Sequence, residues 1–225
     1  MNNKQKLGHS FTFNLAQEQT EVEQIKSQDF SHHIVQKPDF DVYTCQLTVM
    51  FCDLVGSTAL SEQLALCAYW NILQQYQERC SLIIQNCQGY ISQPLGDGLM
   101  IYFGFPTLQQ DDATRAIQAG LDVLLAIEQL NVFFKEWEIN LAVRVGIATG
   151  EVLMAQVHSS DKSEWLAIGV IPNIAARLQS LAPSNSIVFC PKTHQLVREC
   201  FDCQSLGAKS LKGISQPMEV YQVSR

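Results

Sequence analysis

Two aspartates stand where a carboxylate can reach a ligand instead of packing. Asp53 directly follows a short apolar run, residues 47–52, and Asp97 lies between two glycines ahead of a second apolar run, residues 99–103. Each pattern predicts a strand end or a hairpin tip. Alone, Asp53 is typical of a helix cap and Asp97 of a turn residue. Together, two such carboxylates form a site for hard divalent cations, which hold and activate phosphates.

The composition is that of a packed protein. The chain has 225 residues, of which 47% are hydrophobic and 16% charged, so it is long enough for one sizeable domain with a core. A net charge of −7 disfavours non-specific contact with nucleic acid or anionic membranes, and we expect no nucleic-acid partner. No run is predicted to approach the length of a membrane span, and residues 1–13 lack the pattern of a signal peptide. These features predict a cytoplasmic protein.

The eight cysteines are interpreted as reduced thiols and not as a disulfide framework. Five lie in apolar segments and are expected to be buried: Cys52, Cys67, Cys80, Cys87 and Cys190. Cys200 and Cys203 make a single CxxC pair, which is weak evidence for zinc because no second pair accompanies it.

Residues 1–44 are polar, and we interpret them as an N-terminal tail or coupling segment ahead of one catalytic domain, residues 45–225. Leu15, Val22 and Ile25 could line one face of a short helix within the tail. His32 and His33 are adjacent, so they share neither a helix face nor a strand face, and a solvated loop is favoured over a metal site.

The order of elements from residue 46 onward predicts an α+β fold. Strand, helix, strand, strand, helix and strand are expected at residues 47–52, 57–87, 89–93, 99–103, 111–130 and 139–149. This is the ferredoxin-like, split βαβ (palm-like) pattern, with a central, mostly antiparallel sheet and helices packed on it. It places the first strand beside the central hairpin, and therefore Asp53 beside Asp97.

The remaining elements are expected in the C-terminal half. Residues 150–157 should pair with 139–149, and residues 169–181 should hold a helix with Pro172 in its first turn. Shorter elements are expected at residues 165–168, 187–190, 191–197 and 220–223.

Five sequence blocks, in order, resemble the class III nucleotidyl cyclases, the catalytic domains of adenylate and guanylate cyclases. The blocks are residues 48–58, residues 89–91 with 95–98, residues 143–150, residues 173–178 and residues 211–213. The sequence of residues 172–179 is similar to that of a bacterial subgroup whose cyclase domain often precedes an ATPase and helical repeats. The chain is therefore interpreted as a stand-alone cyclase or a fragment. A palm-type polymerase or a diguanylate-forming enzyme shares the two-metal logic, but the acidic composition and the ordered blocks count against both.

The resemblance implies a head-to-tail homodimer with active sites at the subunit interface. It assigns two Mg²⁺ or Mn²⁺ ions to Asp53, Asp97 and the backbone carbonyl of Leu54. The following turn opens a helix, so its amides could receive phosphate oxygens. The residues of this turn are Val55, Gly56, Ser57 and Thr58.

The resemblance also implies roles for two residues four positions apart on one helix face. Asn173 would orient the ribose and Arg177 would stabilise charge on the transferring phosphate, both from the partner chain. Arg144 and Lys212 match triphosphate-binding positions. Without the resemblance, all four would be interpreted as exposed polar residues.

The positions that select the base depart from the patterns of both adenylate- and guanylate-forming members. They are Gln93 and Leu166 in this chain. Glutamine can donate and accept, so Gln93 suits either purine, whereas Leu166 can only pack against a base. We expect conversion of ATP to 3′,5′-cyclic AMP and pyrophosphate in second-messenger signalling. A cyclase for GTP or a pyrimidine triphosphate, and a catalytically silent nucleotide-binding dimerisation module, are the alternatives.

Overall fold

The computed structural model describes residues 42–159 and 162–224. The tail helix expected around Leu15, Val22 and Ile25, and the pair His32 and His33, lie outside the described residues. The strands are β1 (Val42–Leu54), β2 (Tyr90–Leu95), β3 (Gly98–Phe103), β4 (Val143–Ser159), β5 (Lys162–Ile168), β6 (Ser186–Phe189), β7 (Cys203–Lys209) and β8 (Met218–Val223). The helices are α2 (Ser57–Gln63), α3 (Leu66–Asn86), α4 (Asp112–Phe133), α5 (Val170–Leu181) and α6 (Pro191–Val197), with a 3₁₀ turn at Lys135–Trp137.

The strands form one sheet in the order β2-β3-β1-β4-β6-β8-β7, and β5 pairs with the outer half of β4. β1 runs antiparallel to both of its neighbours, β3 and β4, and β2 is antiparallel to β3. β4 and β6 form a parallel pair. The order β2-β3-β1-β4, with α3 and α4 as its two crossover helices, is the ferredoxin-like arrangement, so the predicted fold is confirmed.

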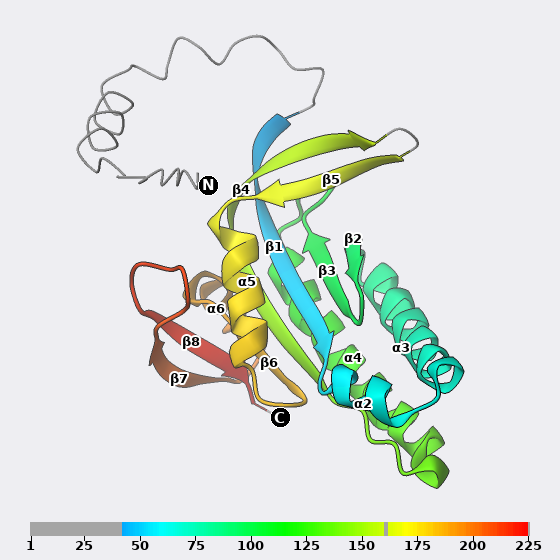
Figure 1. The fold of residues 1–225 in the computed structure, drawn as a ribbon. Helices are drawn as coiled ribbons and strands as arrows, with labels where there is room; N and C mark the ends of the chain where they lie inside the picture. The colour runs from blue at the N-terminus through cyan, green and yellow to red at the C-terminus, as the bar shows by residue number, and fades with distance from the viewer. Residues whose placement is uncertain (1–41, 160–161, 225) are drawn as a thin grey trace, which may run out of the picture. The chain divides into compact units, whose positions relative to one another are not determined.

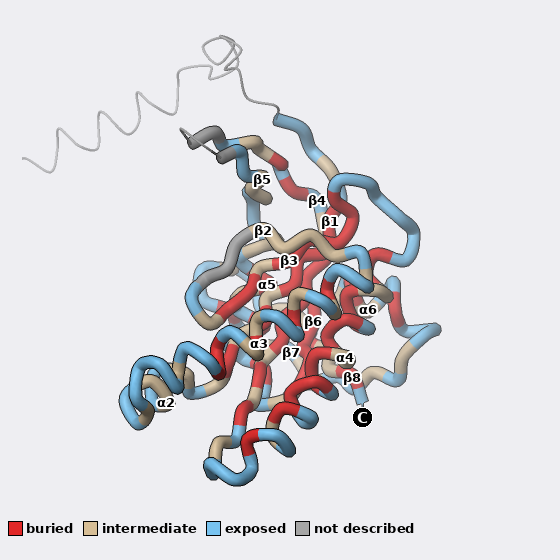
Figure 2. Tube along the Cα trace, turned by 90° about the vertical axis from the view of Figure 1, so that its right-hand side faces the viewer, coloured by how far each residue is buried: buried red, intermediate tan, exposed pale blue. Residues whose placement is uncertain are grey.

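β1 is buried on both faces, and its alternation assigns each side chain to one layer. Met50 and Cys52 pack in the core cluster that includes α3 and α4, whereas Leu47 and Val49 pack in the cluster that includes α5. α5 lies over β1 and β4 on one face of the sheet, with α4 behind (Figure 1). The buried positions follow β1, β3 and β4 through the middle of the molecule (Figure 2). Because side chains alternate along a strand, Asp53 belongs to the face that α5 covers.

A glycine sets how closely α5 approaches the sheet. A Cβ atom on Gly146 of β4 would lie 2.1 Å from the backbone nitrogen of Gln179 and 2.3 Å from the carbonyl oxygen of Ala175. These atoms belong to the backbone of α5, which cannot move aside as a flexible side chain can. The absence of a side chain at Gly146 therefore lets the helix rest directly on β4.

Three expectations about the elements are wrong. Residues 57–87 form two helices, because Leu64 and Ala65 are extended, with ψ of 153° and 140°. Local propensity favours a continuous helix here, but the break lets Leu60 and Leu64 pack against the same core as α3. Residues 150–157 do not fold back on 139–149: both segments contribute to the single strand β4, whose outer half pairs with β5. β7 was not expected from the sequence.

Two further expectations need correction, and the first is that no run approaches the length of a membrane span. α4 has 22 residues and contains an apolar window with a mean hydropathy of 1.3, so one helix among the described residues is long and apolar enough to cross a membrane. Half of its apolar window is buried against the rest of the domain, as in many core helices. All eight cysteines are free, and Cys52, Cys80 and Cys190 are buried as predicted, but Cys67 is exposed and Cys87 only partly buried.

Gly146→Ala should destabilise the domain, because the added methyl meets the backbone of α5. Overpacking of this kind costs about 1–3 kcal/mol of the free energy of unfolding. The matched control is Gly120→Ala in α4, whose nearest neighbour, 2.9 Å away, is the tip of the flexible Ile187 side chain. Urea unfolding of both variants measures the difference, and equal stabilities would contradict the close approach of α5.

Candidate functional site

Asp53 occupies the next-to-last position of β1, at the end where the chain turns into α2. Gly56 makes this turn with a φ of +71°, a left-handed conformation that glycine adopts without strain. The backbone amide of Val55 donates to the carbonyl oxygen of Ala142 at 2.7 Å. Of the four amides expected to receive phosphate, Val55 is therefore already engaged, which leaves those of Gly56, Ser57 and Thr58.

Asp97 lies in the two-residue turn between β2 and β3. Gly96 takes a φ of +68°, and the side-chain amide of Gln77 in α3 donates to its carbonyl oxygen at 2.8 Å. β3 pairs with β1 so that Leu99 is opposite Cys52. This register carries the hairpin tip to the end of β1 where Asp53 lies, so the predicted juxtaposition of the two acids is present.

The two carboxylates interact directly and unfavourably. Burial raises the pKa of the Asp53 carboxyl above its ordinary value, and the negative charge of Asp97, to which it is also hydrogen-bonded, raises the pKa further. The Leu54 amide and the guanidinium of Arg144 act in the opposite direction, but the net pKa shift is upward. The surroundings of Asp53 therefore disfavour its negative charge on balance.

The donor set fits a hard divalent cation. Both side chains offer only carboxylate oxygens, and the carbonyl of Leu54, the last residue of β1, is the next backbone acceptor along the chain. Within residues 42–159 and 162–224, no three His, Cys, Asp or Glu side chains gather into a larger cluster. In phosphate chemistry, Mg²⁺ is commonly bound by one or two carboxylates, and water and substrate phosphates supply its remaining ligands.

Arg144 brings a positive charge to the end of β1 where Asp53 lies. It lies opposite Asp53 in the β1–β4 register. Its Nε atom is buried and has no hydrogen-bond partner among the described residues. A buried guanidinium N–H is costly to leave unpaired, so this group is available to an anion that enters the site.

α5 presents two different faces. Asn173 and Arg177 are exposed, and the Asn173 side chain donates to the carbonyl of Gly169 at 3.2 Å. Gln179, two residues after Arg177 and so about 200° around the helix, is buried and donates through Nε2 to Oδ2 of Asp53 at 3.3 Å. Within one chain, the structure thus brings Gln179 to the acids and turns Asn173 and Arg177 away from them.

Lys212 is exposed in the segment between β7 and β8, whereas the hairpin with Asp97 belongs to the opposite edge of the sheet. The structure therefore does not bring Lys212 to the acid pair of its own chain.

The two base-recognition candidates come from neighbouring segments. The Ser92 hydroxyl donates to the carbonyl of Trp165 at 3.1 Å, so Gln93 on β2 and Leu166 on β5 each follow a linked residue. A second link joins β3 to β5, where the Ala167 amide donates to the Tyr102 hydroxyl at 3.1 Å. Leu166 is partly exposed.

Gln179 is the site residue that sequence reasoning missed. The other buried residues of α5 are apolar: Ile174, Ala175 and Leu178. A polar residue continuing this apolar stripe was the available signal, because a buried amide needs a partner.

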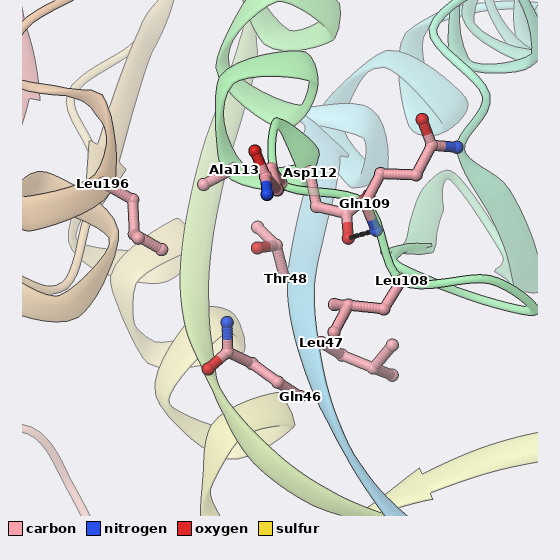
Figure 3. A pocket seen from close by; sticks show the side chains of 9 residues that line it. Gln46, Leu47, Thr48, Leu108, Gln109, Asp112, Ala113 and Leu196 are labelled. Atoms are coloured by element: carbon pink, nitrogen blue, oxygen red, sulfur yellow. Dashed lines mark hydrogen bonds between the residues drawn. The ribbon is translucent and has the colours of Figure 1, made fainter.

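A separate hollow of about 350 Å³ lies beside the other half of β1 (Figure 3). Gln46, Thr48 and Leu196 line it, together with Asp112, whose Oδ2 accepts the backbone amide of Gln109 at 2.9 Å. Asp112 is also paired with Arg115. Its carboxylate thus has an ion-pair partner in Arg115, whereas the Asp53 carboxylate accepts from two neutral donors, the Gln179 side chain and the Leu54 amide.

Asp53→Asn should raise the free energy of unfolding at pH 7. The raised pKa means that ionisation of Asp53 costs more in the folded chain than in the unfolded chain, so stability falls as pH rises through the folded-state pKa. The gain in the variant should therefore shrink as pH is lowered towards about 4, the ordinary aspartate pKa. Urea unfolding from pH 4 to pH 8 tests this, with the exposed Asp202→Asn as control. A variant less stable than the parent at pH 7 would contradict the repulsion.

Comparison with known proteins places this chain in a family. A family model described as the adenylate and guanylate cyclase catalytic domain matches residues 40–225. The crystal structure of the adenylyl cyclase CyaB from P. aeruginosa matches with a TM-score of 0.79 at 30% identity, over 82% of this chain and 96% of that one. The guanylyl cyclase Cya2 matches with a TM-score of 0.75 at 26% identity, over 80% and 92% of the two chains.

A curated relative carries a third base in its name. The cytidylate cyclase of Escherichia coli is 29% identical over 154 residues, which are 64% of this chain and 34% of that protein. The chain spans only 13–37% of the length of the first curated relatives that it matches. The family model covers most of the chain, and the chain therefore belongs to the adenylate and guanylate cyclase catalytic domain family.

Proposed function

We propose that the chain converts ATP to 3′,5′-cyclic AMP and pyrophosphate. The observation that carries the proposal is the proximity of the Asp53 and Asp97 carboxylates at the end of β1. In the reaction, the ribose 3′-oxygen forms a bond to the α-phosphorus while the bond to the bridging oxygen of pyrophosphate breaks. The hydroxyl proton is released, and pyrophosphate is the leaving group.

Asp53 and Asp97, with the Leu54 carbonyl, would hold two divalent cations. When bound, Mg²⁺ or Mn²⁺ lowers the pKa of the 3′-hydroxyl and neutralises charge on the triphosphate. Arg144 would pair with a phosphate oxygen through the guanidinium group whose Nε has no partner among the described residues. The amides of Gly56, Ser57 and Thr58 would receive phosphate oxygens, and Lys212 would come from elsewhere in the assembly.

The exposed face of α5 supports a second copy as the source of Asn173 and Arg177. The two residues share that face with Val170 and Leu181, which are 51% and 37% exposed. Apolar residues on both sides of a polar pair are typical of an interface centre that is closed on assembly. We infer that Asn173 of a second copy orients the ribose, and that its Arg177 stabilises charge on the transferring phosphate.

A different base is the second candidate. Leu166 offers the base no hydrogen bond, so the selectivity for adenine that a polar side chain gives is absent at this position. A cytidylate cyclase and a guanylyl cyclase both lie among the similar proteins. GTP or a pyrimidine triphosphate is therefore the alternative substrate.

Incubation with an equimolar mixture of ATP, GTP, CTP and UTP should yield cyclic AMP as the dominant product, with Mg²⁺ or Mn²⁺ present. Mass spectrometry of the products identifies the base. Asp53→Asn and Asp97→Asn should each lower turnover by roughly 100-fold or more, because each removes a cation ligand. If another cyclic nucleotide dominated, the corresponding triphosphate would be the substrate in place of ATP. Nucleotide binding without pyrophosphate release would favour the silent module.

Mixing Asp53→Asn chains with Arg177→Ala chains should restore about one competent site per heterodimer, because each site draws on both chains. Either variant alone should be inactive. Specific activity of the parent should also fall on dilution below the dissociation constant of the dimer. Absence of rescue in the mixture, with both variants folded, would argue against shared sites.

A further inference from the structure

Gln179 differs from its neighbours on the buried face of α5. It is 9% exposed and polar, and it follows Ile174, Ala175 and Leu178 along that face. Both ends of its side-chain amide have a partner: Nε2 donates to Oδ2 of Asp53 at 3.3 Å, and Oε1 lies 3.3 Å from the Ser180 hydroxyl, which it shares with the Ala176 carbonyl at 3.0 Å. A buried amide held at both ends has a fixed orientation.

The backbone around Gln179 is fixed as well. Its nitrogen and Cα would lie 2.1 Å and 2.7 Å from a Cβ atom on Gly146, so α5 rests on β4 at this residue. Gly146 is opposite Phe51 in the β1–β4 register, two positions before Asp53 on β1. Gln179 therefore reaches Asp53 from a backbone that packs directly on the sheet.

We propose that Gln179 is a positioning residue that orients the Asp53 carboxylate for the divalent cation. The inference rests on the proposed function, because it concerns the same pair of acids. The amide N–H engages Oδ2, and the Leu54 amide adds a second hydrogen bond to the same carboxylate. These bonds restrict the rotation of the carboxylate without supplying a positive charge.

The neutrality of the amide is the chemical reason for glutamine at this position. A lysine or arginine here would pair with Asp53 and compensate the charge that the cation needs. An apolar residue would leave the carboxylate without this donor, and partners that orient metal ligands typically contribute 10- to 100-fold to metal affinity. Glutamine supplies a donor and leaves the negative charge in place.

Mn²⁺ titration of the purified full chain, followed by the electron paramagnetic resonance of the free ion, tests the proposal without turnover. Gln179→Met, close in size but without a donor, should weaken Mn²⁺ binding about tenfold. Gln179→Asn keeps an amide that is one methylene shorter, and it should show the same loss. The matched control is Gln118→Met on α4, which removes an exposed hydrogen bond of 2.9 Å from the Gln118 side-chain amide to the Asp122 carboxylate. Unchanged Mn²⁺ affinity in either folded Gln179 variant overturns the proposal.

The heterodimer of Asp53→Asn and Arg177→Ala chains gives a second test. It distinguishes a loss of Asp53 positioning from general damage to the fold by Gln179→Met. Its competent site uses Asp53 of the Arg177→Ala chain. Gln179→Met should lower the rate about tenfold more on that chain than on the Asp53→Asn chain. Equal losses in both placements would indicate general damage to the fold and would overturn the positioning role. A parent chain without cyclase activity contradicts the proposed function alone, since the Mn²⁺ titration still decides the role of Gln179.

Discussion

The site depends on two carboxylates that the fold holds together against their mutual repulsion. Asp53 is partly desolvated and lies against Asp97, and both conditions raise the pKa of its carboxyl. An isolated strand end or hairpin tip would let such charges separate into water. Their proximity is therefore imposed by the surrounding structure, and stability given up at a site in this way is a common sign of function.

The centre of the sheet is the part of the structure that holds the two acids together. β1 is paired on both edges and buried on both faces, so its end cannot shift without disturbing two core clusters. The hairpin that carries Asp97 is fixed by its register with β1 and by Gln77 of α3. Arg144, the cation opposite Asp53, leaves its Nε without a hydrogen bond among the described residues. The protein thus brings both acids and a guanidinium to the same end of β1.

The sequence around each acid was enough to predict the strand end and the hairpin tip, because short stretches of neighbouring residues determine both. An apolar run ending in Asp53, and Asp97 between glycines, give the strand end and the hairpin tip directly. The βαββαβ order then places them side by side. The break after Leu64 could not be predicted, because a leucine-rich segment favours a helix and only packing against the core interrupts it. The continuity of β4 through Gly150 was missed for a similar reason, since glycine usually suggests a turn and here accommodates the side chain of Ile171.

Gln179 illustrates a different limit. Its position in the apolar stripe of α5 shows that it needs a partner, but the partner lies 126 positions earlier in the chain. Only the packing of α5 on Gly146 brings the two together. Periodicity could therefore mark the residue as unusual and could not name what it binds.

The same packing gives α5 a role at two places at once. One face of the helix carries Gln179 against the acid of its own chain, and the opposite face exposes Asn173 and Arg177. Because the helix backbone rests on β4 without an intervening side chain, a movement of one face requires a movement of the other. In a dimer that shares its sites, α5 would link the cation ligands of one site to the ribose and phosphate contacts of the other. The geometry of assembly and the geometry of the acid pair would then be set by one rigid element.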